Sequence, residues 1–244
     1  MRRRAGRFEP EDAGSHFAGV SRLTSAGYAA PRWRGRLLPR LWKHHLPLLL
    51  LSLVSVASLY STRPYKDVLS RASFATAYPA IALLAATLLI GPWKLLRRRL
   101  NPVSIDLRRD LGIWAGILGI VHAGVGQFVH LRGRPWLYYV YGPTEHHRGM
   151  RHDLFGLANY TGAIGVLLLI LLLATSNDLS LRRFGKERWK QLQRWNYAVF
   201  SLAAVHSFAF QGVENQKAPW VVTVALCVIA ALAMQVMGIV RRFA

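Results

Sequence analysis

Acidic residues and cysteines are the residue types that this sequence has least of. The chain of 244 residues holds 11 Asp and Glu against 32 Lys and Arg, a net charge of +21, and Cys227 is its single cysteine. One cysteine excludes an internal disulfide and a thiolate metal cluster. No acidic residue lies in the middle of a long apolar run, which argues against a membrane proton relay, because such relays usually enlist Asp or Glu. No glycine fingerprint for a dinucleotide follows a predicted strand either.

Long apolar runs, in contrast, make up much of the chain. Hydrophobic residues account for 52% of it, and about 20 consecutive apolar residues span the hydrocarbon core of a bilayer. The sequence therefore predicts an all-α integral membrane protein, a bundle of six transmembrane helices. We expect residues 43–244 to form this domain and residues 1–42 to form a basic, mostly disordered tail. The six predicted spans are 44–60, 73–96, 105–130, 157–175, 190–211 and 219–240.

The basic residues lie between the apolar runs and not on one soluble face, which argues against a nucleic-acid partner. The N-terminal segment, the gaps after the second and fourth spans and the C-terminal end together hold 24 Lys and Arg. The other three gaps hold 8. Because cytoplasmic segments carry the excess of Lys and Arg, both termini are predicted to be cytoplasmic. The bilayer is the first expected partner, and the loop at 131–153 is expected on the outside.

Two histidines lie deep inside predicted spans. His122 is 17 residues beyond residue 105, and His206 is 16 beyond residue 190. At a rise of about 1.5 Å per residue, both lie roughly 25 Å from the cytoplasmic ends of their helices. Two imidazoles that face each other from separate helices can fill both axial positions of a haem iron. The second nitrogen of each ring needs a hydrogen-bond partner, for which Ser201 and Ser207 are candidates.

The third predicted helix is rich in glycine. Small residues allow close packing of membrane helices. They also make room beside the helix for a large flat group, and the sequence leaves both explanations open. The five glycines are Gly112, Gly116, Gly119, Gly124 and Gly126.

The segments around the two histidines resemble a known family. RRDLGIW followed by VH at His122, and LRRFGKERWKQLQRWNY followed by VH at His206, are similar to the ferric-reductase-type transmembrane domain. The resemblance covers about residues 44–240 and is closest to the haem-binding membrane subunits of bacterial periplasmic methionine sulfoxide reductase systems. It implies six helices, a b-type haem and passage of electrons across the cell inner membrane.

The sequence departs from that family at the cytoplasmic ends of the two helices. A further histidine precedes the late one by 13 residues in the sulfoxide-reductase subunit, and this chain has Gln193 there. Larger members carry two histidines on each helix, and Arg109 occupies the matching position here. Neither side chain is a usual haem ligand, and Arg has no lone pair to give. We therefore expect one haem b per chain, with His122 and His206 as its axial ligands.

The predicted function is that of a haem protein that carries single electrons. The donor is expected to be quinol or a separate cytoplasmic flavoprotein, and the acceptor a periplasmic protein or a metal ion. No catalytic residue is identified, so the chain is expected to be an electron-transfer component of an oxidoreductase. Arg109 and Arg194 are candidate contacts for haem propionates, for the phosphate of a flavin such as FMN, or for lipid phosphate. The competing hypothesis is a non-redox transporter or scaffold whose two histidines only hydrogen-bond between helices.

Three further histidines lie in the expected outer loop, at His146, His147 and His152. They could bind a metal, but no cysteine or carboxylate accompanies them at a spacing typical of a metal site. His44 and His45, at the cytoplasmic edge of the first span, are the only other candidates for ligands near that side.

Overall fold

The structure, a computed structural model, describes residues 38–63, 67–96, 105–131 and 133–243. The predicted tail at 1–42 lies outside the described residues as far as residue 37. All regular elements in the described ranges are helices, and the one β contact there is an isolated bridge between Val140 and Met150. The all-α prediction is therefore confirmed.

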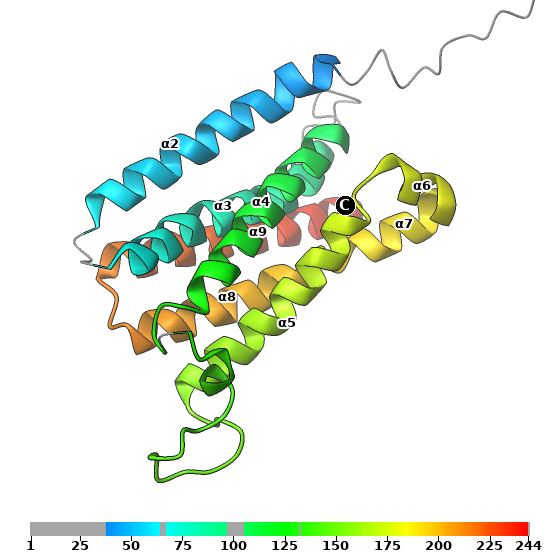
Figure 1. The fold of residues 1–244 in the computed structure, drawn as a ribbon. Coiled ribbons are helices and arrows are strands. Elements are labelled where there is room, and N and C mark those ends of the chain that lie inside the picture. Colours follow the sequence, from blue (N-terminus) through cyan, green and yellow to red (C-terminus); the bar gives the residue numbers. More distant parts are fainter. Residues whose placement is uncertain (1–37, 64–66, 97–104, 132, 244) are drawn as a thin grey trace, which may run out of the picture. The chain divides into compact units, whose positions relative to one another are not determined.

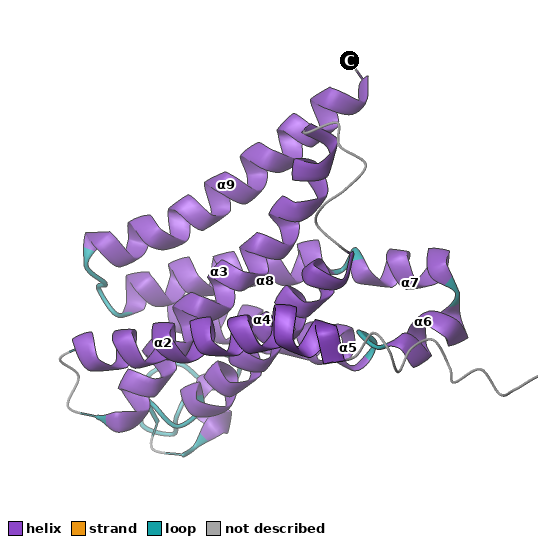
Figure 2. Cartoon of the chain, turned by 90° about the horizontal axis from the view of Figure 1, so that it is seen from above, coloured by secondary structure: helices purple, strands orange, loops and turns teal. Residues whose placement is uncertain are grey.

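The helices from His44 onward form one compact unit (Figure 1; Figure 2 gives the view from above). Six long helices correspond to the six apolar runs, and they are joined by shorter ones. The elements are η1 (Leu41–His45), α2 (Leu46–Thr62), α3 (Val68–Leu96), α4 (Ile105–Gly126), η2 (Pro135–Tyr138), α5 (Leu154–Ala174), α6 (Asp178–Phe184), α7 (Lys186–Gln193), α8 (Asn196–Val213) and α9 (Ala218–Phe243).

Helix α3 is central to the packing, since it contacts α2, α4, α8 and α9, while α5 packs mainly against α8 and also touches α4. Consecutive long helices run in opposite directions (Figure 1). We call the end with α6 and α7 the hairpin end, and the end with the loop 131–153 the loop end. Helices α4 and α8 both begin at the hairpin end and finish at the loop end, so their residues can be compared in depth.

Four helices are long and apolar enough to cross a membrane: Leu38–Thr62, Val68–Trp93, Leu154–Ala174 and Ala218–Arg241. They expose large apolar side chains, as lipid-facing helices do. Helices α4 and α8 are not among the four. The first turns of α4 carry four charged residues, Asp106 and Asp110 with Arg108 and Arg109 between them. Helix α8 has only 18 residues, with polar side chains along it. The predicted count of six spans is thus not confirmed.

The fifth predicted span begins later than expected. The sequence predicts one helix over 190–211, but α7 ends at Gln193 and α8 starts at Asn196. Between them, the N–H of Arg194 bonds the Gln191 carbonyl and the N–H of Trp195 bonds the Leu192 carbonyl. These bonds close shorter rings than those of an α-helix and interrupt it. No Gly or Pro marks the break, which is why the sequence pattern did not show it.

Helix α5 begins at a side-chain cap. The carboxylate of Asp153 accepts a hydrogen bond from the Gly156 N–H at 2.6 Å. Such a cap satisfies one of the free N–H groups of the first turn and fixes where the helix starts. It thereby sets the level of Ala158, one turn further on, whose carbonyl takes part in the site described next.

Candidate functional site

The structure brings together the two histidines that the sequence paired. His122 lies on α4 and His206 on α8, and their ring centroids are 5.9 Å apart with the planes at 77°. Helices α4 and α8 do not pack directly on each other to any extent. The two side chains therefore meet across a space between the helices.

One nitrogen of each ring is held by the backbone of another helix. His122 Nδ1 lies 2.9 Å from the carbonyl oxygen of Ser73 on α3, and His206 Nδ1 lies 2.8 Å from that of Ala158 on α5. A carbonyl oxygen only accepts, so in each neutral ring Nδ1 donates and Nε2 keeps its lone pair. Ser201 and Ser207 are not the acceptors, so that expectation was wrong.

Both rings line a cavity of about 810 Å³ among α3, α4, α5, α8 and α9. Three glycines of α4 line it as well: Gly119, Gly124 and Gly126. The other two face neighbouring helices, since a Cβ on Gly112 or Gly116 would lie in ordinary contact with Thr87 or Leu173. Room beside the helix and close packing thus each explain part of the glycine pattern.

Gly162 on α5 bounds the site tightly. A Cβ at this position would lie 2.6 Å from His206 Nδ1, which is closer than real Cβ atoms approach. Only glycine therefore leaves the imidazole in its hydrogen bond to Ala158, one turn earlier on the same helix. The sequence alone does not distinguish this glycine from its neighbours, because its importance depends on how α8 lies against α5.

These residues fit a haem. Imidazole nitrogen binds metals such as zinc at about 2 Å, so one metal atom between two imidazoles sets their ring centroids roughly 6 Å apart. The observed separation of 5.9 Å agrees with this. Each Nδ1–H already bonds an oxygen, the arrangement that orients a metal-bound histidine. The cavity is also mainly apolar in its lining, as a macrocycle requires.

Comparison with known proteins agrees with the geometry. A family model described as ferric reductase like transmembrane component matches residues 76–204, more than half of the chain. The chain belongs to the ferric reductase-like transmembrane family. It is also 30% identical over 201 residues to the protein-methionine-sulfoxide reductase heme-binding subunits MsrQ of Yersinia pseudotuberculosis serotype O:1b (strain IP 31758) and Yersinia pestis (strain Pestoides F). The match covers 82% of this chain and 84% and 82% of those relatives.

Two other residues singled out in this ferric reductase-like chain lie away from the histidine pair. Arg109 is largely buried at the hairpin end and pairs with Asp178 of α6 at 2.5 Å. Arg194 is exposed in the turn before α8. Neither lines the cavity, so the structure does not bring them to a group held there. Their contact with phosphate at the hairpin end stays a prediction.

The other residues considered as ligands near the hairpin end, Gln193, His44 and His45, contact side chains of the protein instead. Gln193 Nε2 lies 3.4 Å from the Ser176 hydroxyl at the end of α5. His44 and His45 both contact the carboxylate of Asp110, at 2.8 and 3.3 Å. Asp110 is fully buried, so this carboxylate depends on its neighbours for hydrogen bonds.

At the loop end, His130 and Glu214 form a pair that the sequence did not predict. His130 Nε2 lies 3.2 Å from Glu214 Oε1, and both residues line the cavity. The His130 ring stacks on Phe210 at 5.8 Å, and Phe210 contacts the His206 ring at 5.0 Å. These side chains close the cavity towards the loop end. Glu214 follows α8 directly, and only the fold places it opposite His130.

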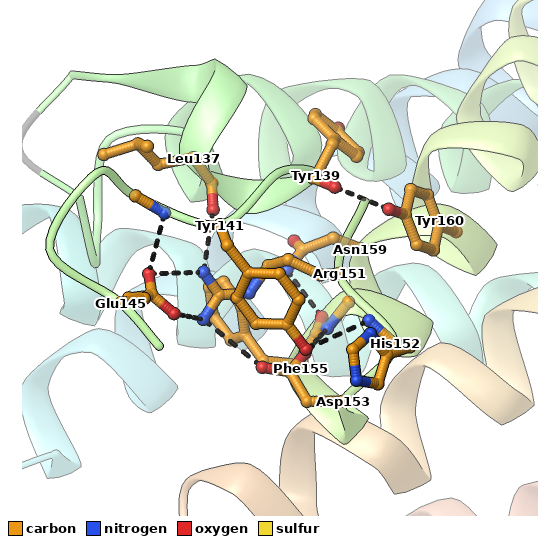
Figure 3. Close-up of polar contacts among 12 residues, drawn as sticks. Leu137, Tyr139, Tyr141, Glu145, Arg151, His152, Asp153, Phe155, Asn159 and Tyr160 are labelled. Carbon is orange, nitrogen blue, oxygen red and sulfur yellow. Dashed lines mark hydrogen bonds and ion pairs between the residues drawn. The ribbon is translucent and has the colours of Figure 1, made fainter. Parts of the chain in front are cut away.

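The loop 131–153 is held by one arginine (Figure 3). Arg151 makes two hydrogen bonds to the Glu145 carboxylate, at 3.0 and 3.1 Å, and an ion pair with Asp153. The Gly142 N–H also bonds Glu145. Together the Gly142 N–H and the Arg151 guanidinium hold the pKa of the Glu145 carboxyl below its usual value. The contacts of the ionised Glu145 carboxylate with Arg151 and with the Gly142 N–H therefore hold the loop in one conformation.

The loop histidines pack as rings. His147 and His152 lie 5.0 Å apart, and each lies 5.2 Å from Tyr141. In the part of the chain that the structure describes, no group of three or more His, Cys, Asp or Glu has the arrangement of a metal site. His147 and His152 thus contribute aromatic contacts to the loop.

Proposed function

We propose that this chain is the haem-binding, electron-transferring membrane subunit of an oxidoreductase system, with His122 and His206 as the axial ligands. One observation carries the proposal. Each ring gives its Nδ1–H to a carbonyl of a neighbouring helix, and both rings line the same cavity. The heme-binding role in the printed names of the relatives supports it. Bound between the rings, a haem would supply one-electron redox chemistry.

The residues around the cavity would orient and enclose that group. The carbonyls of Ser73 on α3 and Ala158 on α5 hold the two rings. Gly162 keeps the His206 ring in position, and the His130–Glu214 pair with Phe210 closes the loop end. The chain's own contribution is thus a fixed pair of ligands in an apolar space.

We propose one haem per chain, of b type. The hairpin end offers no second pair of free imidazoles in the described residues. Arg109 is tied to Asp178, Gln193 lies against Ser176, and His44 and His45 contact Asp110. This distribution of partners supports the single site.

The loop end is proposed to face the periplasm, with both termini in the cytoplasm and the chain in the inner membrane. The 24-to-8 distribution of Lys and Arg supports this orientation. Counted along α4, His122 lies about 25 Å from the hairpin end, which is too deep for direct contact with a cytoplasmic flavin. Quinol within the bilayer is therefore the favoured donor, with a separate flavoprotein as the alternative. The relatives' names support a methionine sulfoxide reductase catalytic subunit as the acceptor, with a metal ion as the other candidate.

A haem-binding function requires the Nε2 atoms of His122 and His206 as ligands, whereas a scaffold or transporter function does not. Hydrogen bonding between helices needs only the Nδ1 contacts, and no hydrogen bond of either Nε2 occurs among the described residues. The test is a spectrum of the detergent-purified protein. A Soret band that shifts on dithionite reduction, with one haem per polypeptide by pyridine haemochrome, is the expected result. A colourless protein after expression with ample haem supply would contradict the function, and two haems would contradict the count.

A further inference from the structure

The cavity has a second side, away from the histidine pair. From His206 to Gln211 the helix α8 advances roughly 7.5 Å and turns about 140°, at five residues of an ideal helix. His206 therefore faces α4 and α5, whereas Gln211 faces α3 and α9. Both residues belong to the part of the cavity lining that α8 contributes.

Gln211 carries a hydrogen-bond acceptor without a donor. The side chain is 8% exposed. Its Nε2 donates to the Trp220 carbonyl at 3.1 Å and lies 3.4 Å from the Tyr78 hydroxyl. Because a carbonyl can only accept, the Trp220 contact fixes which end of the amide is nitrogen. Gln211 Oε1 is then buried with no hydrogen-bond partner in the described part of the chain. A buried acceptor of this kind destabilises the fold unless a ligand supplies a donor.

The walls on this side are aromatic. Phe74 and Tyr78 line the cavity with ring centroids 4.7 Å apart. Trp220 packs against both rings, at 4.8 and 5.2 Å. The guanidinium of Arg63 lies 4.0 Å from the Phe74 ring centroid. Such a wall accepts a flat ring by offset stacking.

We propose that this side of the cavity, bounded by Phe74, Tyr78 and Gln211, binds the head group of a membrane-soluble hydroquinone. A hydroquinone is flat and apolar, enters from lipid, and offers hydroxyl donors, one of which would bond Gln211 Oε1. A haem offers no hydroxyl and could reach the amide oxygen only through a protonated propionic acid. The site deepens and rests on the proposed function, since it sets an electron donor beside the histidine pair.

The test is equilibrium dialysis of duroquinol, a tetramethylhydroquinone, against the full-length, detergent-purified protein reduced with dithionite. The reduced protein accepts no electrons during the titration. Gln211→Leu removes the acceptor and should raise the dissociation constant about tenfold, the effect of one hydrogen bond. Tyr78→Leu should weaken binding as well, and Tyr78→Phe, which keeps the ring, should not. Gln193→Leu is the matched control, because that glutamine lies outside the cavity.

Two further measurements separate this site from the haem site. His122→Ala should lose its haem signal but still bind duroquinol within a few-fold of wild type, because Gln211 faces other helices. In the wild type, an azido-quinone should label α3 near Phe74 or α8 near Gln211. Equal affinities of wild type and Gln211→Leu would overturn the proposal, and so would labelling confined to other segments. A loss of haem from Gln211→Leu at unchanged duroquinol affinity would assign the amide to the haem and also overturn it.

Discussion

An imidazole has two nitrogens, and at His122 and His206 a backbone carbonyl takes one of them. Each ring is thus oriented by a group that any residue type would supply. The sequence marks the histidines, because an ionisable side chain in an apolar run is costly without a role. It cannot mark Ser73 or Ala158, since every residue has a carbonyl and only the packing of α3 and α5 selects these two. This is why the sequence analysis named Ser201 and Ser207 instead.

The first prediction concerns the ligands. His122→Ala and His206→Ala should each abolish the low-spin haem spectrum of the purified protein, because each removes one axial nitrogen. His146→Ala and His147→Ala are the controls, since both residues lie in the loop away from the cavity. The measurement is the reduced-minus-oxidised spectrum at matched protein concentration. A normal spectrum from either cavity mutant would exclude the pair.

The second prediction concerns Gly162. Gly162→Ala adds a Cβ that would lie 2.6 Å from His206 Nδ1 and should push the ring away from the Ala158 carbonyl. Overpacking of this kind destabilises by roughly 1–3 kcal/mol, which corresponds to about five- to 150-fold weaker haem retention. Competition with apomyoglobin would measure that retention.

The control for the Gly162→Ala substitution is a substitution of Gly165 on the same helix. At Gly165 an added Cβ would meet Leu202 at 3.6 Å, an ordinary contact. Gly165→Ala should therefore retain haem as the wild type does. If the two substitutions behave alike, the tight approach at Gly162 does not position His206.

At the scale of the elements, periodicity and apolar length were sufficient to predict an all-helical fold and the four helices that are long and apolar enough to cross a membrane. They failed at the start of α8, where the backbone turns at Arg194 and Trp195 without a Gly or Pro to mark the break. They also could not assign partners to Asp110, whose contacts with His44 and His45 join residues 65 or more positions apart. Such contacts depend on which helices become neighbours, and no local pattern encodes that.

The loop 131–153 gives the third prediction, a dependence on pH. In the folded protein, the Gly142 N–H and Arg151 lower the pKa of Glu145 below its ordinary value of 4.5. The ionised carboxylate therefore stabilises the loop above pH 4.5, and the contribution is lost as the pH falls through the lower folded value. We expect the amides of Tyr141 and Arg151, which bond across the loop, to lose protection from hydrogen exchange in acid.

A substitution at Glu145 distinguishes the effect of this carboxylate from other effects of low pH on the protein. Glu145→Gln should lower the protection of the same two amides at pH 7, after correction for intrinsic exchange rates. Glu187→Gln is the matched control, because Glu187 is exposed on α7, away from the loop, and pairs with Lys190. Unchanged protection in Glu145→Gln would show that the Arg151 contacts do not hold the loop.

For the whole molecule, the fourth prediction concerns orientation. A green fluorescent protein fused after Ala244 should fluoresce, and alkaline phosphatase inserted at Thr144 should be active, because the segments richer in Lys and Arg stay in the cytoplasm. Exchanging the two reporters gives the control, since each should then be silent. Active phosphatase after Ala244 would reverse the orientation and place the histidine pair nearer the cytoplasm.

The partners of the two histidines also fix an order of events during synthesis. A chain emerges from the ribosome N-terminus first, so α3, α4 and α5 enter the membrane before α8 exists. The His122–Ser73 contact can form at that stage, but the His206–Ala158 contact requires α8. The nascent bundle thus carries one oriented imidazole and an open groove, and the second imidazole arrives late. Complete capture of the proposed haem would therefore come at the end of membrane insertion, when α8 packs against α5.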